Sequence, residues 1–487
     1  MRLRALLLLP LLLLTSCTPA EPVAVLEPGQ QPQEQSLSWE SCNEVFECAF
    51  IAAPLDWTSE TGESITISLM RFAGTADREP ILINPGGPGS SAINWMRDGY
   101  EYIGSDWFRE NFQVIAFDPR GVGASTPVTC SDQDLKDELL YSNSGYEYGS
   151  EQDLVVSEAL MLEFAESCQT RGPSTAYFNT QQTARDMDLI RGLLGMEELN
   201  YLGFSYGTEL GANYAALFPD RVGKFVLDGA VDPTMDSSTK LLGQIRGFDG
   251  ALRAYLTACL DTPAYCPFEG DIDSAMARIA GFLQAREVRP LETTIDRELG
   301  ISAALAGMIV TLYSQDSWIY LSQAFDEAFN GDGTFFVYLA DFYNDRDPDG
   351  GYISNINEAN FAINCADNSV TRSGPDLDQE IREASVVFGR YFAGPDISCT
   401  GWPEGIGMQS LDFSVPLANS PIVIGTTGDP ATPYQQAVSL AEILDGAKLL
   451  TLKGEGHTAY GDNSCIDSLV DAYLEGQDLG EGDLTCF

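Results

Sequence analysis

The sequence predicts an α/β fold whose β-sheet is mostly parallel and which carries a long helical insertion. Two observations support this prediction. Up to residue 233, and again from residue 411, short apolar runs alternate with segments of helical periodicity, as in a parallel sheet covered on both faces. Between about residues 234 and 410 the alternation stops and helical segments dominate. With 487 residues, the chain is long enough for two or three domain-sized units.

The first part of the sheet is predicted from short runs of apolar and β-branched residues that end in turn-forming segments. Met187, Ile190 and Leu194 recur at helical spacing and indicate a helix before the central strand. The predicted elements are, in chain order, strands 46–53, 64–72, 79–84 and 111–117, helix 183–195, strand 199–203, helix 208–218 and strand 222–227.

The insertion and the last part of the chain follow. We assign residues 39–233 and 411–487 to one sheet domain, and residues 234–410 to a helical cap over the carboxyl edge of the sheet. In the cap, an acidic loop that contains glycine is expected at 341–351. The predicted elements are helices 274–287, 303–313 and 317–329, then strand 421–425, helix 434–444, strand 447–452 and helix 465–475.

Residues 1–17 have the features of a bacterial lipoprotein signal peptide. Met1-Arg2-Leu3-Arg4 is a basic start, and the apolar run at 6–14 is too short for a typical membrane-spanning helix. Leu14-Thr15-Ser16-Cys17 resembles the lipobox, in which the cysteine is lipidated. The alternative is an ordinary secretory signal with a chance cysteine. We expect an extracytoplasmic protein held at the membrane through Cys17, with residues 18–38 as a flexible tether.

The charge of the chain limits its partners. It has 72 acidic and 26 basic residues, a net charge of −46. Such a surface repels nucleic acid, which requires a basic footprint, and it also repels anionic lipid headgroups. A membrane contact is therefore expected only through the lipid anchor. The excess of acid is interpreted as a solvated surface that aids solubility, with attraction of cationic peptides as the alternative.

The cysteines predict disulfides. Eleven are present, and lipidation of Cys17 leaves an even set of ten, as expected for an exported protein. We expect sequential pairing, because it closes short loops within single structural units. No Cys-x-x-Cys pattern occurs and the chain has one histidine, so neither a metal site nor a cofactor is expected. The predicted pairs are 42–48, 130–168, 259–266, 365–399 and 465–486.

Gly203-Phe204-Ser205-Tyr206-Gly207 lies between a predicted strand and a predicted helix. This Gly-x-Ser-x-Gly pattern is typical of the nucleophile elbow of α/β-hydrolases, a sharp turn that exposes a serine Oγ above a helix N-terminus. The pattern alone is weak, because Gly and Ser are common. The flanking glycines suit a turn that brings backbone segments into close contact.

A general base and an acid follow the elbow in the order Ser, acid, His that this fold uses. His457, the only histidine, lies in a loop after the last predicted strand. Asp429 lies after the strand before it and is the expected acid. Asp228 and Asp232 follow an earlier strand and are the alternatives, whereas Asp118 is expected to be a structural turn residue.

The loop Pro85-Gly86-Gly87-Pro88-Gly89 follows the predicted strand at 79–84. In this fold the loop at that place supplies one backbone N–H of the oxyanion hole, and the residue after the nucleophile supplies the other. Gly86 and Gly87, together with Tyr206, are the expected donors. The alternative for the loop is a plain Gly/Pro turn.

Five segments carry a resemblance to a known family: NPGGPG at 84–89, DPRGVGAS at 118–125, GFSYGT at 203–208, LDGAVDP at 227–233 and GTTGDPATP at 425–433. Together they resemble the tripeptidyl-aminopeptidase-like branch of the prolyl-aminopeptidase family, serine peptidases of actinobacteria that are secreted or lipid-anchored. The resemblance extends from about residue 40 to the C-terminus. It implies the α/β-hydrolase fold with a helical cap, the triad Ser205, Asp429 and His457, and the oxyanion loop. Some members of this branch are cell-envelope proteases that act on folded proteins.

The resemblance also implies that the cap holds the amino terminus of the substrate. A desolvated ammonium group needs a carboxylate partner. Asp367, with Asn364 beside it, and Glu209, one turn after the nucleophile, are candidates, and a structural role is the alternative for each.

These observations predict an exported serine peptidase that releases amino acids or short peptides from peptide N-termini through an acyl-enzyme. A carboxylesterase or lipase on the same fold is one alternative, because the same machinery cleaves esters. A cell-envelope endoprotease is another, and a lipid-anchored binding protein without catalytic activity is a third.

Overall fold

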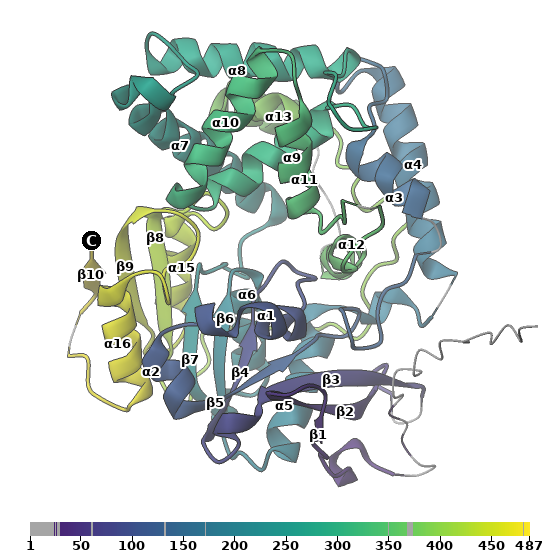
Figure 1. Cartoon of the computed structure of the whole chain (residues 1–487). Coiled ribbons are helices and arrows are strands. Elements are labelled where there is room, and N and C mark those ends of the chain that lie inside the picture. Colours follow the sequence, from purple (N-terminus) through teal and green to yellow (C-terminus); the bar gives the residue numbers. More distant parts are fainter. Residues whose placement is uncertain are drawn as a thin grey trace, which may run out of the picture.

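The computed structural model of the chain describes residues 24, 26, 30–59, 62–130, 133–170, 172–348, 350–367, 374–480 and 482–487. A layered body built around the sheet carries a body of helices above it (Figure 1). Cys17 and the predicted signal segment lie outside the described residues. In the described part of the chain, no helix combines the length and the apolar character needed to cross a membrane.

The described residues form one ten-stranded sheet in the order β1-β2-β3-β5-β4-β6-β7-β8-β9-β10. The pairs β1–β2, β2–β3 and β3–β5 are antiparallel, and every pair from β5 to β10 is parallel. The predicted mostly parallel sheet is thus confirmed. The strands are β1 (Glu40–Ser41), β2 (Phe46–Pro54), β3 (Ser64–Phe72), β4 (Glu79–Asn84), β5 (Phe112–Phe117), β6 (Leu199–Phe204), β7 (Val222–Asp228), β8 (Ile422–Gly428), β9 (Lys448–Glu455) and β10 (Leu484–Cys486).

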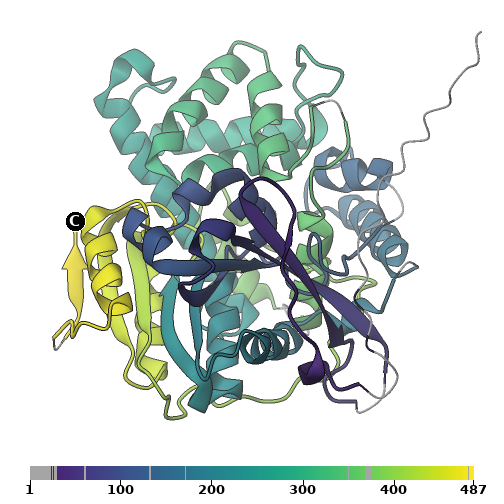
Figure 2. The ribbon, with the colours of Figure 1, turned by 60° about the horizontal axis from the view of Figure 1, so that its bottom comes forward.

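Helices cover both faces of the sheet. Apolar side chains of α5, α6 and α15 form one core with the strands, and those of α1, α2 and α16 form a second core on the opposite face. Burial on both sides explains why the central strands are apolar along their length rather than alternating. Figure 2 shows these layers from another side. The helices are α1 (Ala92–Gly99), α2 (Asp106–Asn111), α5 (Thr180–Leu193), α6 (Tyr206–Leu217), α15 (Tyr434–Ile443) and α16 (Ser464–Leu474).

The helical insertion has a hydrophobic core of its own, separate from the two cores of the sheet. Phe282, Phe325, Phe329 and Phe336 contact one another at its centre, with ring centroids 5.1–5.9 Å apart. These helices lie above the carboxyl ends of the strands (Figure 1). They are α7 (Ser237–Asp261), α8 (Ile272–Val288), α9 (Ile301–Leu312), α10 (Trp318–Phe329), α11 (Thr334–Tyr343), α13 (Pro375–Ala384) and α14 (Gly389–Phe392).

Three further helices join the two bodies. They are α3 (Gln133–Tyr141), α4 (Glu151–Gln169) and α12 (Ile356–Asp367). Although α12 lies within the predicted cap segment 234–410, it packs with α4 into the core of the sheet domain. The helical insertion is therefore not one body. Short 3₁₀ segments complete the chain: Pro32–Glu34, Ala73–Thr75, Tyr100–Tyr102, Thr175–Tyr177, Pro219–Arg221, Pro263–Tyr265 and Gln315–Ser317.

The end of the predicted tether is part of the fold. The Gln35 side chain donates to the Ala52 carbonyl and accepts from the Ala52 N–H, both at 2.7 Å. Leu37 packs against the core that the strands form with α5, α6 and α15. The prediction of a flexible tether is therefore wrong for these residues, because glutamine can pair with a strand edge as a second backbone would.

The predicted disulfide pairing is confirmed in full. All five bonds join cysteines that are close in sequence, and the widest separations are 38 and 34 residues. The bonds are Cys42–Cys48, Cys130–Cys168, Cys259–Cys266, Cys365–Cys399 and Cys465–Cys486.

Candidate active site

Ser205 lies at the turn between β6 and α6, with φ 55° and ψ −126°, a conformation that non-glycine residues rarely adopt. The turn requires glycine on both sides. A Cβ at Gly203 would lie 2.5 Å from the Gly207 carbonyl oxygen, and one at Gly207 would lie 2.7 Å from the Asn84 carbonyl oxygen. The Ser205 N–H donates to the Asp228 carbonyl at 2.8 Å, which joins the turn to the end of β7. The local geometry is that of the predicted elbow.

The loop after β4 lies against this turn. A Cβ at Gly86 would lie 2.5 Å from the Phe204 carbonyl oxygen and 3.1 Å from the Tyr206 nitrogen. The Gly86 N–H already donates to Asn84 Oδ1 at 3.0 Å. Within the described chain, the Gly87 and Tyr206 N–H groups have no acceptor. Gly86 thus allows the loop after β4 to lie close to the turn at Ser205. The backbone N–H groups of Gly87 and Tyr206 are the two donors that are available to a ligand.

Asp118, at the end of β5, fixes the helix that follows this loop. Its carboxylate accepts from Ser91 Oγ at 2.8 Å, from the Ile93 N–H at 3.1 Å and from the Ala124 N–H at 2.9 Å. It is fully buried, and burial raises its pKa to about 6 despite these hydrogen bonds. This agrees with the structural role expected for Asp118.

On the other side of the loop after β4, α12 contributes Asn360, whose side chain donates to the Pro88 carbonyl at 2.9 Å.

Asp429 and His457 are in contact. His457 Nδ1 lies 2.8 Å and 3.0 Å from the two carboxylate oxygens of Asp429. Asp429 has no exposed side-chain surface, and His457 has 11%. Asp429 also accepts from the N–H groups of Ala431 and Thr432, both at 2.9 Å, and from Thr432 Oγ1 at 3.0 Å. These donors fix the orientation of the carboxylate toward the imidazole.

The helical cap also holds His457. The Tyr313 carbonyl, at the end of α9, accepts from the His457 N–H at 2.8 Å. The Tyr313 ring meets the imidazole edge-on, with 5.3 Å between ring centroids. Burial opposes the charged imidazolium, but Asp429 and Asp228 outweigh it, so the pKa of His457 is raised above its ordinary value of 6.5.

Of the alternative acids, Asp228 lies beside the loop of His457 and Asp232 does not. Asp228 Oδ2 accepts from the Ala459 N–H at 2.9 Å and from the Tyr460 N–H at 2.8 Å. Asp232 accepts instead from the Thr234 N–H at 2.8 Å and from Ser439 Oγ at 2.5 Å, a turn role. The contact with His457 Nδ1 favours Asp429 as the acid.

The three candidates for binding a substrate amine have separate partners, and the two carboxylates lie in two groups. Glu209 forms an ion pair with Lys240 of α7 at 2.9 Å. Asp367 accepts from the Thr180 N–H and Oγ1, and Thr180 Oγ1 also lies 2.5 Å from the Tyr206 hydroxyl. Burial raises the pKa of Asp367 to about 7.

Asn364 belongs to neither group and donates to Asn360 Oδ1 at 3.0 Å. Asn360 in turn holds the Pro88 carbonyl of the loop after β4. The structure therefore links Asp367 through Thr180 to the Tyr206 hydroxyl, and Asn364 through Asn360 to the loop after β4.

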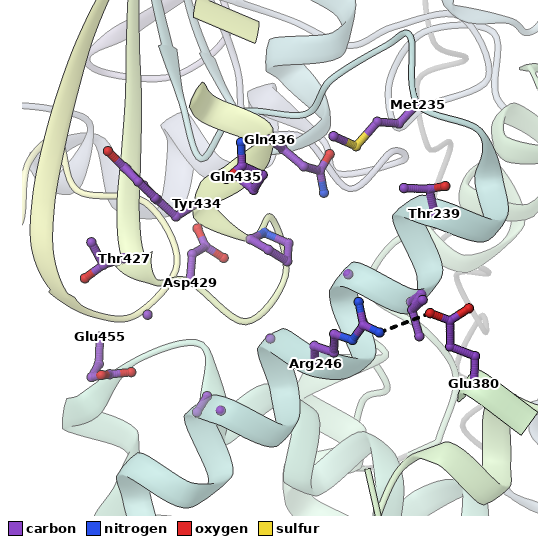
Figure 3. Close-up of a pocket in the computed structure, with 17 residues that line it drawn as sticks. Met235, Thr239, Arg246, Glu380, Thr427, Asp429, Tyr434, Gln435, Gln436 and Glu455 are labelled. Atoms are coloured by element: carbon purple, nitrogen blue, oxygen red, sulfur yellow. Dashed lines mark hydrogen bonds and ion pairs between the residues drawn. The ribbon is translucent and has the colours of Figure 1, made fainter. Parts of the chain in front are cut away.

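A cavity of about 730 Å³ lies between α7 of the cap, the end of β8 with the loop after it, and the start of α15. Figure 3 shows Arg246 paired with Glu380 on one side, and Thr427, Asp429 and Glu455 on the other. Ser205 and His457 are not among the residues that line it, whereas Asp429 is. No group of three or more potential metal ligands occurs among the described residues.

The sequence did not point to Thr180, Tyr313 or Thr432, which the structure places against Tyr206, His457 and Asp429. Thr432 lies within the motif at 425–433 and so had a local signal. Tyr313 follows cap helix α9, far from His457 in sequence, and only the tertiary contact identifies it.

The sequence of this chain is similar to two family models and to several known enzymes. A family model of the alpha/beta hydrolase fold matches residues 79–265, and a model described as TAP-like protein matches residues 384–486. Serine protease Hip1 of Mycobacterium tuberculosis is 34% identical over 446 residues, 88% of this chain and 85% of that protein. Carboxylesterase B of the same species is 34% identical over 96% of this chain and 93% of its own length.

Tripeptidyl aminopeptidase of Streptomyces coelicolor is 27% identical over 92% of this chain and 86% of that protein. The similarity to each of the three covers the sheet domain and the insertion together, as the resemblance noted in the sequence predicts. With its parallel sheet, its elbow and its TAP-like C-terminal part, the chain belongs to the α/β-hydrolase family, in the branch that includes these mycobacterial and Streptomyces enzymes.

Proposed function

We propose that this protein is an exported serine peptidase that releases amino acids or short peptides from the N-termini of peptides. The observation that carries the proposal is the contact between His457 and Asp429, in a chain whose Ser205 lies at the turn between β6 and α6. The relatives named as a serine protease and a tripeptidyl aminopeptidase favour peptide bonds as the target.

In the proposed reaction, Ser205 Oγ attacks the scissile carbonyl carbon while His457 Nε2 takes its proton. Asp429 holds the Nδ1–H and stabilises the imidazolium. The Gly87 and Tyr206 N–H groups bind the oxyanion. The intermediate collapses, His457 gives the proton to the leaving amine, and the acyl-enzyme remains. Water, activated by His457, then releases the acyl product and restores Ser205.

The proposed site for the substrate amine is Asp367, with Glu209 and Asn364 nearby. Lys240 forms an ion pair with Glu209, whereas Asp367 is held by hydrogen bonds from Thr180 and has no ion pair among the described residues, so Asp367 is the carboxylate that we assign to the substrate ammonium group. Asp367→Asn should lower kcat/KM for substrates with a free amino terminus and leave N-blocked substrates unchanged. Equal losses on both would assign Asp367 a structural role.

Ester hydrolysis is the second candidate, because carboxylesterase B is 34% identical over almost the full chain. Endoproteolysis is a third mode of action for the same site. A tripeptide anilide, p-nitrophenyl butyrate and an N-blocked peptide, compared at equal enzyme concentration, separate the three activities.

Export is proposed together with anchoring through Cys17. Five disulfides suit an oxidising compartment. Cys17→Ala should move the protein from the membrane fraction to the soluble fraction without loss of activity. Retention of that variant in the membrane would contradict the anchor.

Labelling with a fluorophosphonate tests the proposed nucleophile directly. Wild-type protein should be labelled at Ser205 and lose activity in proportion. Ser205→Ala should be neither labelled nor active, whereas Ser468→Ala, at an exposed serine of α16, should behave as wild type. Labelling of Ser205→Ala at wild-type rate would overturn the assignment.

A further inference from the structure

Asp228, the last residue of β7, joins the two segments that carry the proposed nucleophile and base. Its carbonyl accepts from the Ser205 N–H at 2.8 Å. Its Oδ2 accepts from the Ala459 and Tyr460 N–H groups at 2.9 Å and 2.8 Å. One residue thus sets the position of the elbow and of the loop that contains His457.

The same carboxylate carries a charge that its hydrogen bonds do not require. Asp228 is fully buried, and within the described chain its Oδ1 has no hydrogen-bond partner. A neutral acceptor would satisfy the Ala459 and Tyr460 N–H groups equally well and would avoid burying a charge. The unpaired oxygen therefore points to a role for the charge itself.

The charged groups that act on Asp228 are His457 and Asp429. Burial raises the pKa of Asp228 to about 6, and the like charge of Asp429 adds to this rise. The hydrogen bonds from the two backbone N–H groups and the charge of His457 lower the pKa, but by less. The carboxylate is therefore ionised at neutral pH. The next residue, Gly229, lies against the imidazole, because a Cβ there would be 3.1 Å from His457 Cε1.

We propose that Asp228 is a positioning residue for His457, which holds its loop at the elbow and, as a second buried carboxylate, favours the imidazolium. Asp429 binds Nδ1, whereas Asp228 acts through the backbone of residues 459 and 460 and through its charge. The inference rests on the proposed function for its effect on rate, but its effect on the imidazole does not depend on any substrate.

The single histidine allows a direct test. In protein labelled with [¹³Cε1]histidine, the one signal reports the pKa of His457 by NMR titration. Asp228→Asn retains an acceptor for both N–H groups and removes the charge. We expect it to lower the pKa of His457 by about half a unit to one unit, the lower end of the effect of a nearby charge. The plateau of kcat/KM should fall by up to about tenfold, because one pKa unit corresponds to a factor of ten.

Asp118→Asn is the matched control. Asp118 is equally buried, also accepts two backbone N–H groups and also has its pKa raised to about 6, but it does not act on His457. This control should leave the pKa of His457 unchanged. Asp429→Asn should lower that pKa further than Asp228→Asn does, because Asp429 contacts the imidazole.

An unchanged His457 titration in folded Asp228→Asn would overturn the inference and leave Asp228 a hydrogen-bonding role alone. If that variant does not fold, Asp228→Ser replaces it with the same expectation. An inactive wild-type protein whose histidine still responds to Asp228→Asn would contradict the proposed function and retain the electrostatic link. The two failures are therefore distinguishable.

Discussion

At the scale of single residues, the geometry around Ser205 depends on glycines, which have no side chain. Gly203 and Gly207 let β6 turn into α6 at Ser205, and Gly86 lets the loop after β4 reach the same point. Gly86 also has φ +97°, which disfavours any side chain. The proposed oxyanion donors on Gly87 and Tyr206 are held in register by these contacts.

Gly86→Ala tests this dependence. The new Cβ would lie 2.5 Å from the Phe204 carbonyl oxygen and 2.9 Å from Ser205 Cβ, so the loop has to move away from Ser205. We expect kcat to fall by about 100-fold or more, the usual effect of losing an oxyanion donor. The measurement is steady-state kinetics with a circular-dichroism check of folding.

Gly192→Ala is the control for that substitution. Gly192 lies in α5, and a Cβ there meets no atom within 4 Å. Alanine should leave kcat unchanged and raise the free energy of unfolding by up to about 1 kcal/mol, through helix propensity. Equal activity of the two variants would refute the steric argument for Gly86.

At the scale of elements, a buried ion pair fixes the loop after β5 to α5. Arg120 and Asp186 both have 0% exposed side-chain surface and form a two-pronged pair at 2.7 Å and 2.8 Å. Arg120 also donates to the carbonyls of Pro54 and Leu55 at the end of β2. Trp57 Nε1 donates to the same Asp186 at 2.8 Å. The motif at 118–125 is therefore a joint between strand ends, in agreement with the structural role inferred for Asp118.

Arg120→Met should destabilise the protein strongly, because it leaves the Asp186 carboxylate buried without its cation. The expected loss in the free energy of unfolding is about 3–5 kcal/mol. Arg97→Met is the comparison, because its pair with Asp98 is 45% and 64% exposed and is worth about 1 kcal/mol or less. Urea denaturation followed by tryptophan fluorescence measures both, and similar losses would contradict this account.

At the scale of the whole molecule, acidic residues outnumber basic ones, and some of the carboxyl groups are buried. The net charge is −46, and Asp118 and Asp228 are buried with pKa values raised to about 6 from 3.8. Between these values the folded protein binds protons that the unfolded chain does not, so stability decreases as pH rises through this window. Surface repulsion among carboxylates acts in the same direction.

The protein should therefore be more stable at pH 5 than at pH 7.5. In 0.5 M salt, which screens the surface charges, we expect the buried acids alone to contribute roughly 1–3 kcal/mol. Below about pH 4 stability should fall again, because hydrogen bonds from Arg346 and Tyr352 outweigh burial and lower the pKa of Asp137. Thermal unfolding against pH measures this. A double variant, Asp118→Asn with Asp228→Asn, should reduce the rise between pH 7.5 and 5 and leave the part that Asp367 and His457 contribute through their raised pKa values. A Tm that climbs steadily toward alkaline pH would contradict the prediction.

The limits of prediction follow from the same physics. Central strands such as β4, β6 and β7 were predicted within one or two residues, because buried parallel strands are continuous apolar runs. The cap was predicted less well: Asp341 was expected to begin a loop, but α11 continues to Tyr343. The length of α7, and the packing of α12 with the sheet domain, were not predicted. Helix ends and partners in a helical cap are decided by tertiary contacts that no local pattern contains.

By itself the sequence determined the fold class, because strand ends and turns are local features. It predicted the order Ser205, Asp429, His457 for the proposed triad, and the even number and short spacing of the cysteines predicted the disulfide pairs that the structure contains. Only the tertiary structure separated Gly87 from Gly86 as the available donor, by giving the Gly86 N–H to Asn84. It also brought Asp228 and Tyr313 to His457. Hydrogen bonds and electric fields act through space, and segments distant in the chain meet only when the core between them is packed.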